Sequence, residues 1–219
     1  MSGKEVQKLS RRAVDYGITL SSTQLDLFRI YLDEFWEWNR HMNLTGLSTR
    51  ERMVIELFLD SLIPAPLLSG QGTLLDVGSG AGLPGVPLKI YYPKLQTHLL
   101  EANSKKIHFL RNVLRNLKLS DISALKGRIE KDQSRLNPCG YRLITARALA
   151  DLAQTLNWCA PLLEHGGQML CFLGKRGEGT LRDNRELVRR HRLRMEHVVP
   201  YVLPGKKEKR YAVIFKKVG

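Results

Sequence analysis

A glycine-rich turn and an acidic residue that follows it about 20 positions later have the spacing of a ligand site. The turn lies in residues 73–85, which read TLLDVGSGAGLPG. The Leu- and Val-rich start predicts a buried strand, and the glycines allow a tight turn that a ligand can approach without meeting a Cβ atom. Pro84 suits the first turn of a following helix. A strand, a glycine turn and a helix N-terminus together form the usual seat of a nucleotide-like ligand at the carboxyl edge of a sheet.

Glu101 narrows the class of ligand. It ends a second predicted strand, residues 96–101, and a carboxylate at that offset can accept hydrogen bonds from two ribose hydroxyls. A solvated strand end is the alternative explanation for this residue. Leu83 stands where the dinucleotide fingerprint has its third glycine. The two features predict a cofactor that carries a ribonucleoside, either an NAD-like dinucleotide or S-adenosylmethionine (AdoMet).

The composition is that of a globular chain with excess positive charge. The 219 residues are 43% hydrophobic and carry a formal net charge of +14, and this length suffices for one α/β domain with an appended piece. Because the chain has neither an apolar run of about 20 residues nor an apolar signal core, we expect a cytoplasmic protein. From residue 174 onward, 14 Lys and Arg residues stand against 5 Asp and Glu residues. This excess favours nucleic acid as a partner over a merely solvated basic surface.

Helices are expected before the glycine turn. Ser21 and Gln24 have the spacing of a capping box, and they introduce a helical pattern of Leu and Phe residues. A second amphipathic helix is expected around residues 50–62, and prolines end it. We therefore predict a helical cap over residues 1–70 and a sheet domain over residues 71–219.

Strands and helices alternate in the sheet domain. Beyond residue 101, strands are expected at residues 122–125, 142–147 and 168–173, with a helix at about 149–163 and a Gly166-Gly167 turn before the last strand. This alternation implies a parallel sheet with right-handed crossovers. Two final strand-like runs, residues 195–202 and 211–218, predict a β-hairpin. Such an ending is the habit of class I AdoMet-dependent methyltransferases, which are α/β proteins with a Rossmann-like sheet.

Several motifs together resemble the RsmG (GidB) family of bacterial enzymes, which methylate N7 of one guanine in 16S ribosomal RNA (rRNA). They are WNRHMNLT at 38–45, LDS at 59–61, DVGSGAGLPGVPL at 76–88, LLE at 99–101 and TARA at 145–148. The resemblance implies a guanine-N7 rRNA methyltransferase that takes its methyl group from AdoMet, leaves S-adenosyl-L-homocysteine, and acts on 16S rRNA or the small ribosomal subunit. The sequence departs from the family pattern at Glu56 and Leu57, where a basic residue and a His are usual. This departure puts in doubt a role for that helix end in RNA binding.

The resemblance also implies site residues. For the cofactor they are Gly78, Gly80, Gly82 and Leu83 in the turn, Glu101, Ala102 and Asn103 at the second strand, Ile129 and Glu130 after the third, and Arg147 at the end of the fourth. Within this set, Glu101 would hold the ribose hydroxyls, and Ile129 and Glu130 would flank the adenine. Arg147 would face the methionine end of AdoMet or the incoming guanine.

Methylation of guanine N7 requires the protein to position the two reactants. Guanine N7 already presents a lone pair, so its methylation needs neither a base nor a metal, and the protein must align the two reactants in a water-poor site. We therefore predict no dedicated catalytic residue and no metal. Arg147 is the orienting candidate, and Asn43 and Thr45 are candidates for contacts on the base side. The guanine has to be presented unstacked.

Phosphate contacts are predicted in the basic C-terminal part. The candidates are Lys175, Arg176, Arg189, Arg190, Lys206, Lys207, Lys209 and Arg210. We expect a monomer, because no self-complementary apolar face stands out in the sequence.

Other functions are weighed against the same residues. Pro138-Cys139 resembles the motif of 5-methylcytosine enzymes, but it precedes the fourth strand instead of following it. The sequence has no Asn-Pro-Pro-Tyr-like block, which argues against amino-group methylation. Lys175 is the only residue that would support ribose methylation. An NAD(P)-dependent oxidoreductase and a non-catalytic RNA-binding module on the same fold are the alternatives from other classes.

Overall fold

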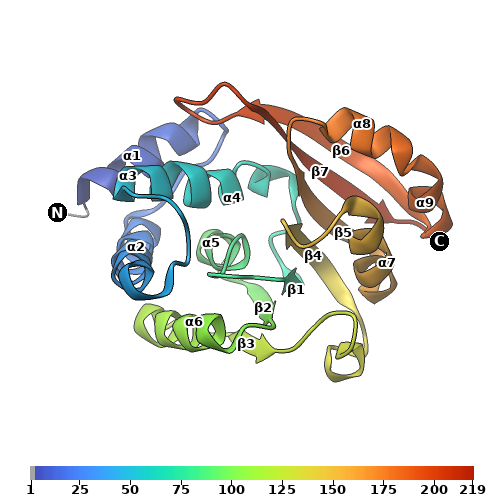
Figure 1. Ribbon diagram of the computed structural model, residues 1–219, viewed down its shortest axis with the longest axis horizontal. Coiled ribbons are helices and arrows are strands. Elements are labelled where there is room, and N and C mark those ends of the chain that lie inside the picture. Colours follow the sequence, from blue (N-terminus) through green and yellow to red (C-terminus); the bar gives the residue numbers. More distant parts are fainter. Residues whose placement is uncertain (1–2) are drawn as a thin grey trace.

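The computed structural model describes residues 3–219, and it shows a sheet of seven strands with helices on both faces (Figure 1). The strands are β1 (Gly72–Val77), β2 (Leu95–Glu101), β3 (Ile122–Lys126), β4 (Tyr141–Arg147), β5 (Leu163–Leu173), β6 (Leu193–Val202) and β7 (Lys209–Lys217). Their order in the sheet is β3-β2-β1-β4-β5-β7-β6. The strands β1 to β5 are parallel, whereas β7 runs antiparallel to both β5 and β6. The predicted sheet with its C-terminal hairpin is confirmed.

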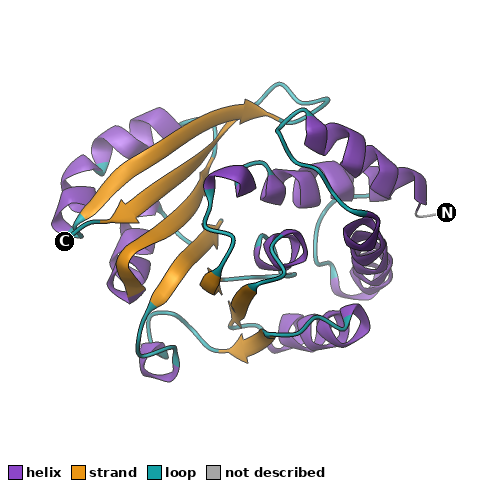
Figure 2. Cartoon of the chain, turned by 180° about the vertical axis from the view of Figure 1, so that it is seen from behind, coloured by secondary structure: helices purple, strands orange, loops and turns teal. Residues whose placement is uncertain are grey.

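The helices divide between the two faces of the sheet (Figure 2). On one face lie α1 (Gly3–Val14), α2 (Ser22–Met42), α3 (Arg50–Met53), α4 (Asp60–Leu62), α5 (Gly85–Tyr91) and α6 (Ser104–Leu117), and on the other lie α7 (Leu152–Cys159), α8 (Gly177–Asp183) and α9 (Arg185–Arg190). Successive side chains of a strand point to opposite faces of the sheet, so they pack against different layers of helices. In β1, for example, Leu74 is buried in the first cluster, whereas Leu75 and Val77 belong to the second. Between residues 3 and 219, no helix has the length and apolar character needed to cross a membrane.

The N-terminal helices pack directly against the glycine turn. The predicted capping box forms, with the Ser21 side chain accepting from Gln24 N–H and the Gln24 side chain accepting from Ser21 N–H. Further along α2, the Tyr31 hydroxyl donates to the carbonyl of Ala81 in the turn at 2.5 Å. The ring of Tyr31 also stacks on Phe58 at 4.7 Å between centroids. The helices of residues 3–70 therefore fix the turn from one side, while the division of the chain at residue 70 stays a prediction.

Two expected boundaries differ in the structure. The helix predicted from residue 149 begins only at Leu152, because Ala148 has a left-handed φ of 51° and Asp151 caps the first turn by accepting from Gln154 N–H. The turn predicted at Gly166-Gly167 is instead an irregularity inside β5. Strand pairing shifts there from Tyr141 opposite Leu163 to Leu143 opposite Gln168. The bulge therefore lets β5 begin earlier than its hydrophobic run suggests.

Asp76 supports the glycine turn from beneath. Its side chain is fully buried in β1, where one carboxylate oxygen accepts from the Thr145 hydroxyl at 2.7 Å and the other from Gly85 N–H at 3.1 Å. The Ser79 hydroxyl donates to the backbone carbonyl of Asp76 at 2.8 Å. A Cβ atom on Gly85 would lie 2.8 Å from the Asp76 carboxylate, so this close contact requires glycine. Burial raises the pKa of Asp76 to about 6, although the hydrogen bonds from Thr145 and Gly85 oppose the rise.

We predict that Asp76 makes stability depend on pH. Its pKa of about 6 in the folded state exceeds the ordinary value of 3.8, so the folded chain binds this proton more tightly than the unfolded chain. The free energy of unfolding should therefore fall by ~3 kcal/mol as the pH rises from about 4 to about 6, and this loss should persist above pH 6. Urea unfolding between these pH values would measure it.

The variant Asp76→Asn isolates this contribution. Its amide cannot titrate, so its stability should fall less than that of the wild type over the same pH range. The matched control is Asp183→Asn on α8, because Asp183 is exposed and its replacement should leave the wild-type profile intact. Parallel profiles for the wild type and Asp76→Asn would contradict the prediction.

Candidate active site

The glycine turn follows β1 at the carboxyl edge of the sheet. Gly78 N–H and Ser79 N–H both donate to the carbonyl of Leu100, at 2.9 and 3.0 Å, so the turn is fastened to the end of the neighbouring strand β2. Gly78 has a φ of +68°, and a Cβ atom there would lie 2.8 Å from Leu149 Cδ1. The turn therefore needs glycine both for its conformation and for its close approach to Leu149.

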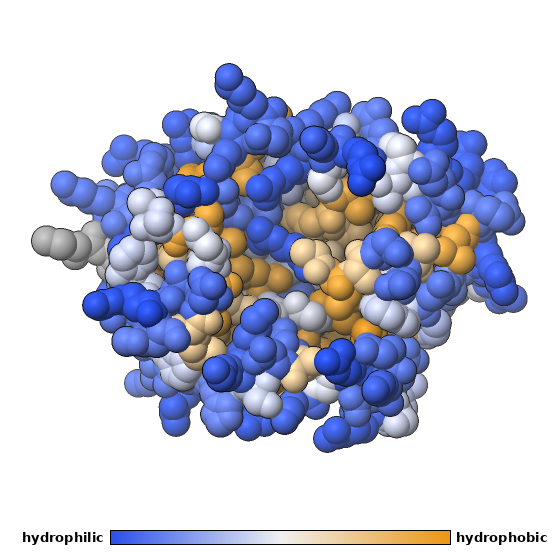
Figure 3. Space-filling view, viewed as in Figure 1, coloured by the Kyte–Doolittle hydropathy of each residue, from blue (hydrophilic) through white to orange (hydrophobic). Residues whose placement is uncertain are grey.

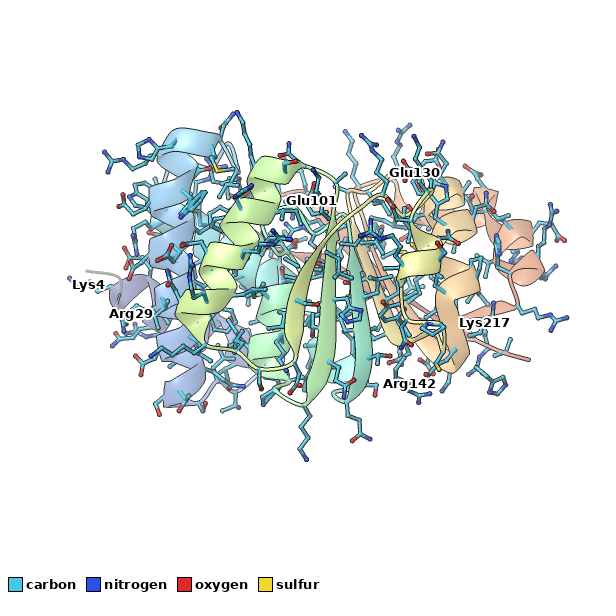
Figure 4. The ribbon with its side chains drawn as sticks, turned by 90° about the horizontal axis from the view of Figure 1, so that it is seen from below. Lys4, Arg29, Glu101, Glu130, Arg142 and Lys217 are labelled. Carbon is cyan, nitrogen blue, oxygen red and sulfur yellow. The ribbon has the colours of Figure 1, made fainter. Side chains whose placement is uncertain are left out.

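Glu101 is held in a fixed orientation at the end of β2. One carboxylate oxygen accepts from Gly80 N–H at 2.8 Å, and the other accepts from Asn103 N–H at 2.7 Å. The residue is only 8% exposed. Each oxygen of an ionised carboxylate has room for about two hydrogen bonds, so both can still accept from a ligand. In Figure 4, Glu101 and Glu130 lie at the same edge of the sheet, opposite the end that carries Arg142.

A first cavity of about 270 Å³ opens beside Glu101. It brings together five of the predicted cofactor residues, and seven further residues that were not predicted complete it. The predicted ones are Gly78, Glu101, Ala102, Ile129 and Glu130, and the others are Val77, Leu100, Gly127, Arg128, Ala148, Leu149 and Trp158. Its volume is just below the roughly 300–1,000 Å³ of typical ligand pockets, which suits one nucleoside better than a whole dinucleotide.

Other predicted cofactor residues lie outside the first cavity. Gly80 and Asn103 contact it indirectly, through their hydrogen bonds to Glu101. Gly82 and Leu83 do not line it, and a Cβ atom on Gly82 would lie 2.7 Å from Val86 Cγ2, so this glycine serves packing within the turn. Arg147 also lies outside it, in a second cavity.

The second cavity, of about 390 Å³, adjoins the first. Both are lined by Ala148, the residue with the left-handed φ that follows β4. The remaining lining residues of the second cavity are Asp60, Arg147, Phe172, Leu173, Gly174, Tyr201 and Arg210. Figure 3 shows this face hollowed near its centre, with hydrophobic side chains exposed among hydrophilic ones. Two ligand groups bound in the two cavities would therefore meet at Ala148.

A buried carboxylate organises the second cavity. The side chain of Asp60 is only 2% exposed, and it pairs with Arg147 at 2.9 Å and with Arg210 at 3.0 Å. The Tyr201 hydroxyl donates to the same carboxylate at 2.9 Å. Burial and the charge of Asp60 raise the pKa of Tyr201, so the hydroxyl keeps its proton and remains a donor. The carboxylate thus joins a helix, the end of β4 and both strands of the hairpin.

Arg147 is held by a π-helical segment, Val54–Leu59, between α3 and α4. Asp60 N–H donates to the carbonyls of Ile55, five residues back, and of Leu57. The Glu56 carbonyl accepts from Arg147 Nη2 at 2.9 Å. The guanidinium also lies 5.8 Å from the centre of the Phe172 ring. These contacts fix the orientation of Arg147 toward the second cavity, and segments of this kind often occur at functional sites.

The two candidates for base-side contacts lie elsewhere. Asn43 caps the C-terminus of α2 in a left-handed conformation, with φ 51°, and its N–H donates to Asn39 O at 3.3 Å. Thr45 N–H donates to the Asn39 side chain at 2.7 Å. Neither residue lines the first or the second cavity, and their observed contacts shape the turn after α2.

The predicted phosphate-binding residues divide into two groups. Exposed side chains are those of Lys175, Arg176, Arg189, Arg190, Lys207 and Lys209. The other two are partly buried in ion pairs, because Lys206 contacts Glu56 at 3.0 Å and Arg210 contacts Asp60. Glu56, whose presence weakened the case for RNA binding at this helix end, is thus the residue that holds Lys206.

Sequence reasoning missed several residues of the two cavities. Leu149 follows the predicted β4 by two positions, so its place at the same edge was a usable signal. Trp158, Phe172 and Tyr201 reach the cavities only through packing between distant segments, which local patterns do not report. Cys139 is exposed and lines neither cavity. Among residues 3–219, no group of three or more His, Cys, Asp and Glu side chains could hold a metal ion.

Solved structures share the fold. A methyltransferase from Pyrococcus furiosus superposes with a TM-score of 0.61 over 87% of this chain and 97% of its own, at 14% identity. TYW2 from M. jannaschii, solved in complex with AdoMet, superposes with a TM-score of 0.58 over 73% of this chain and 75% of its own, at 12% identity. At such identities these structures show the fold alone, and they confirm the predicted class I methyltransferase architecture.

Sequence comparison identifies the family. The ribosomal RNA small subunit methyltransferase G of Acetivibrio thermocellus is 33% identical over 94% of this chain and 85% of its own length. The protein of the same name from Chloroflexus aggregans is 40% identical over 80% of this chain and 74% of its own. A family model described as rRNA small subunit methyltransferase G matches residues 24–210. The chain therefore belongs to the rRNA small subunit methyltransferase G (GidB) family.

Proposed function

We propose that this protein transfers a methyl group from AdoMet to N7 of a guanine in small-subunit rRNA. The observation that carries the proposal is the pair of adjoining cavities, which meet at Ala148 and have a fixed carboxylate in one and a fixed guanidinium in the other. Family membership supplies the reaction class. We further propose that the protein acts as a monomer in the cytoplasm, on 16S rRNA or the small ribosomal subunit.

The residues of the first cavity fit the adenosine part of AdoMet. The carboxylate of Glu101, already oriented by Gly80 and Asn103, would accept hydrogen bonds from the ribose hydroxyls. Ile129 and Glu130 would flank the adenine, together with the apolar side chains of Leu149 and Trp158. Gly78 would let the ligand approach the backbone of the turn. AdoMet supplies an activated methyl group on a sulfonium, so the protein's part is to bind and align it.

The second cavity fits the acceptor base. Phe172 offers an apolar ring, and the guanidinium groups of Arg147 and Arg210 are hydrogen-bond donors next to it. Guanine O6 is an acceptor beside N7, and arginine is the side chain that most often pairs with this edge. In the transfer, the bond from methyl carbon to sulfur breaks as the bond from carbon to N7 forms, and the positive charge passes from sulfur to the purine. Arg147 would orient the base without exchanging a proton.

Product mapping tests the proposed reaction. The pure protein incubated with AdoMet and unmodified 16S rRNA should yield 7-methylguanosine at a single position when digested RNA is examined by mass spectrometry. Methylation at another atom or another base would contradict the assignment to N7. An absence of transfer by protein that binds S-adenosyl-L-homocysteine would instead favour a non-catalytic RNA-binding module.

We predict that Glu101→Gln weakens cofactor binding. The amide can accept at only one end, so the N–H of either Gly80 or Asn103 loses its partner, and the ribose loses a charged acceptor. The Kd for S-adenosyl-L-homocysteine, measured by calorimetry, should rise at least ~10-fold, because hydrogen bonds to charged groups contribute about 1.5–3 kcal/mol. The exposed Glu186 on α9 provides the control Glu186→Gln. An unchanged Kd in a folded Glu101→Gln variant would sink the ribose assignment.

Arg147→Lys should separate catalysis from cofactor binding. Lysine keeps the positive charge but has a single nitrogen. It cannot reproduce the fork of Arg147, whose Nη2 contacts Asp60 and the Glu56 carbonyl while Nη1 donates to the Leu57 carbonyl and the Ser61 hydroxyl. We expect kcat for methyl transfer to fall ~100-fold, since misplacement of a positioning group has about this effect, with little change in the Kd for S-adenosyl-L-homocysteine. Arg142→Lys, at the opposite end of the same strand, is the control. Equal kcat values for the two variants would rule out the orienting role.

A further inference from the structure

We propose that α1 and the turn between β6 and β7 form a docking groove for the phosphate backbone of the RNA, and we call it the α1 groove. This inference rests on the proposed function, because it takes the substrate to be RNA. The α1 groove is a cavity of about 370 Å³ that lies between Lys8 and Arg12 of α1, Arg52 of α3 and Lys206 of the turn. The helix α1 precedes the residues 24–210 that the family model matches, so the groove is partly built from residues beyond that match.

The outer face of α1 extends the groove as a basic surface. Val6, Leu9 and Ala13 bury the inner face of this helix, and its exposed residues include Lys4, Arg11 and Arg12. The α1 groove and the hollow next to it on α1 are together lined by six basic side chains and three acidic ones. A groove with this balance of charge attracts a polyanion, and RNA phosphates are the polyanion that the proposed reaction brings to the protein.

Glu56 holds Lys206, a basic side chain of the α1 groove that comes from the turn between β6 and β7. Its carboxylate accepts from Arg52 at 2.7 Å and pairs with Lys206 at 3.0 Å. Burial raises the pKa of Glu56, but the hydrogen bonds from Arg52 and Lys206 outweigh burial and lower it overall, so the carboxylate stays charged. Lys206 is therefore tethered at the groove with part of its side chain exposed. A cation held in place loses less freedom when it meets a phosphate.

Glu56, which lines the α1 groove, also contacts Arg147 of the second cavity. Glu56 contacts Lys206 through its carboxylate, and its backbone carbonyl accepts from Arg147 at 2.9 Å. On the hairpin, Arg210 of the second cavity follows Lys206 by four positions. In Figure 1 the turn between β6 and β7 lies beside α1, at the end of the molecule away from α9. An RNA strand with one base in the second cavity would thus place its flanking phosphates along the α1 groove.

Neutralising the exposed residues of α1 tests the proposal. We compare the triple variant Lys4→Gln, Arg11→Gln and Arg12→Gln with a matched triple at α6. The matched triple is Arg111→Gln and Arg115→Gln on the helix and Lys118→Gln just after it, and these residues are also exposed. Affinity for unmodified 16S rRNA is measured between about 50 and 200 mM salt. The slope of log affinity against log salt should become shallower by roughly 2 in the α1 variant, as expected for three lost phosphate contacts. The α6 variant should keep the wild-type slope.

Two further measurements separate charge from folding and from cofactor binding. The charge-conserving variant Lys4→Arg, Arg11→Lys and Arg12→Lys should restore the wild-type slope, and all variants should bind S-adenosyl-L-homocysteine like the wild type. A wild-type salt slope in the neutral α1 variant, or an equally reduced slope in the α6 variant, would overturn the proposed groove. If the wild type still formed 7-methylguanosine, the proposed function would stand. Wild-type protein that neither binds nor methylates the rRNA would overturn both.

Discussion

The carboxylate of Asp60 is the interaction on which the second cavity depends. It is almost completely buried and is shared by Arg147, Arg210 and the hydroxyl of Tyr201. A buried charge of this kind is costly unless it is fully paired, and removing one partner typically costs about 3–5 kcal/mol. The three partners come from the end of β4 and from both strands of the hairpin, so their pairing with one helical residue sets the relative positions of those elements. The cavity walls are therefore in place before any base arrives.

The first cavity follows the same principle of prior orientation. Backbone N–H groups of Gly80 and Asn103 hold the Glu101 carboxylate, while Asp76 holds the opposite side of the turn through Gly85. Ordering these groups in the folded chain means that ligand binding does not have to order them again. The proposed methyl transfer, to a nitrogen that already has a lone pair, would depend mainly on such alignment. Orienting groups around two adjoining cavities would supply it.

Local patterns in the sequence were sufficient to predict the sheet and to single out the turn and the acid that lie beside the first cavity. The run of Leu and Val before Gly78, and the acid that ends the next strand, predicted β1, the turn and Glu101, because all three are encoded within about 30 residues, as in a βαβ unit. The two late strand-like runs likewise predicted the hairpin. The position of β5 was harder to predict, since Gly166 and Gly167 read as a turn but form a bulge within the strand.

The second cavity depends on contacts between distant segments. Asp60 and Tyr201 are separated by 141 positions in the chain, and nothing in the residues around either one reports their hydrogen bond. The π-helical register of Val54–Leu59, which accompanies the Glu56 carbonyl's contact with Arg147, has no pattern distinct from an ordinary amphipathic helix. The same holds for α1 and the hairpin turn, whose basic residues are at opposite ends of the sequence but line one groove.

A crystal structure of the protein with S-adenosyl-L-homocysteine and a guanosine-containing RNA fragment would test whether the two cavities bind the cofactor and the acceptor base. We expect the ribose hydroxyls on the carboxylate of Glu101, the adenine beside Ile129, and the guanine against Phe172 with its N7 directed toward Ala148. A nucleoside bound away from Glu101, or a guanine bound outside the cavity that Asp60 organises, would contradict this expectation.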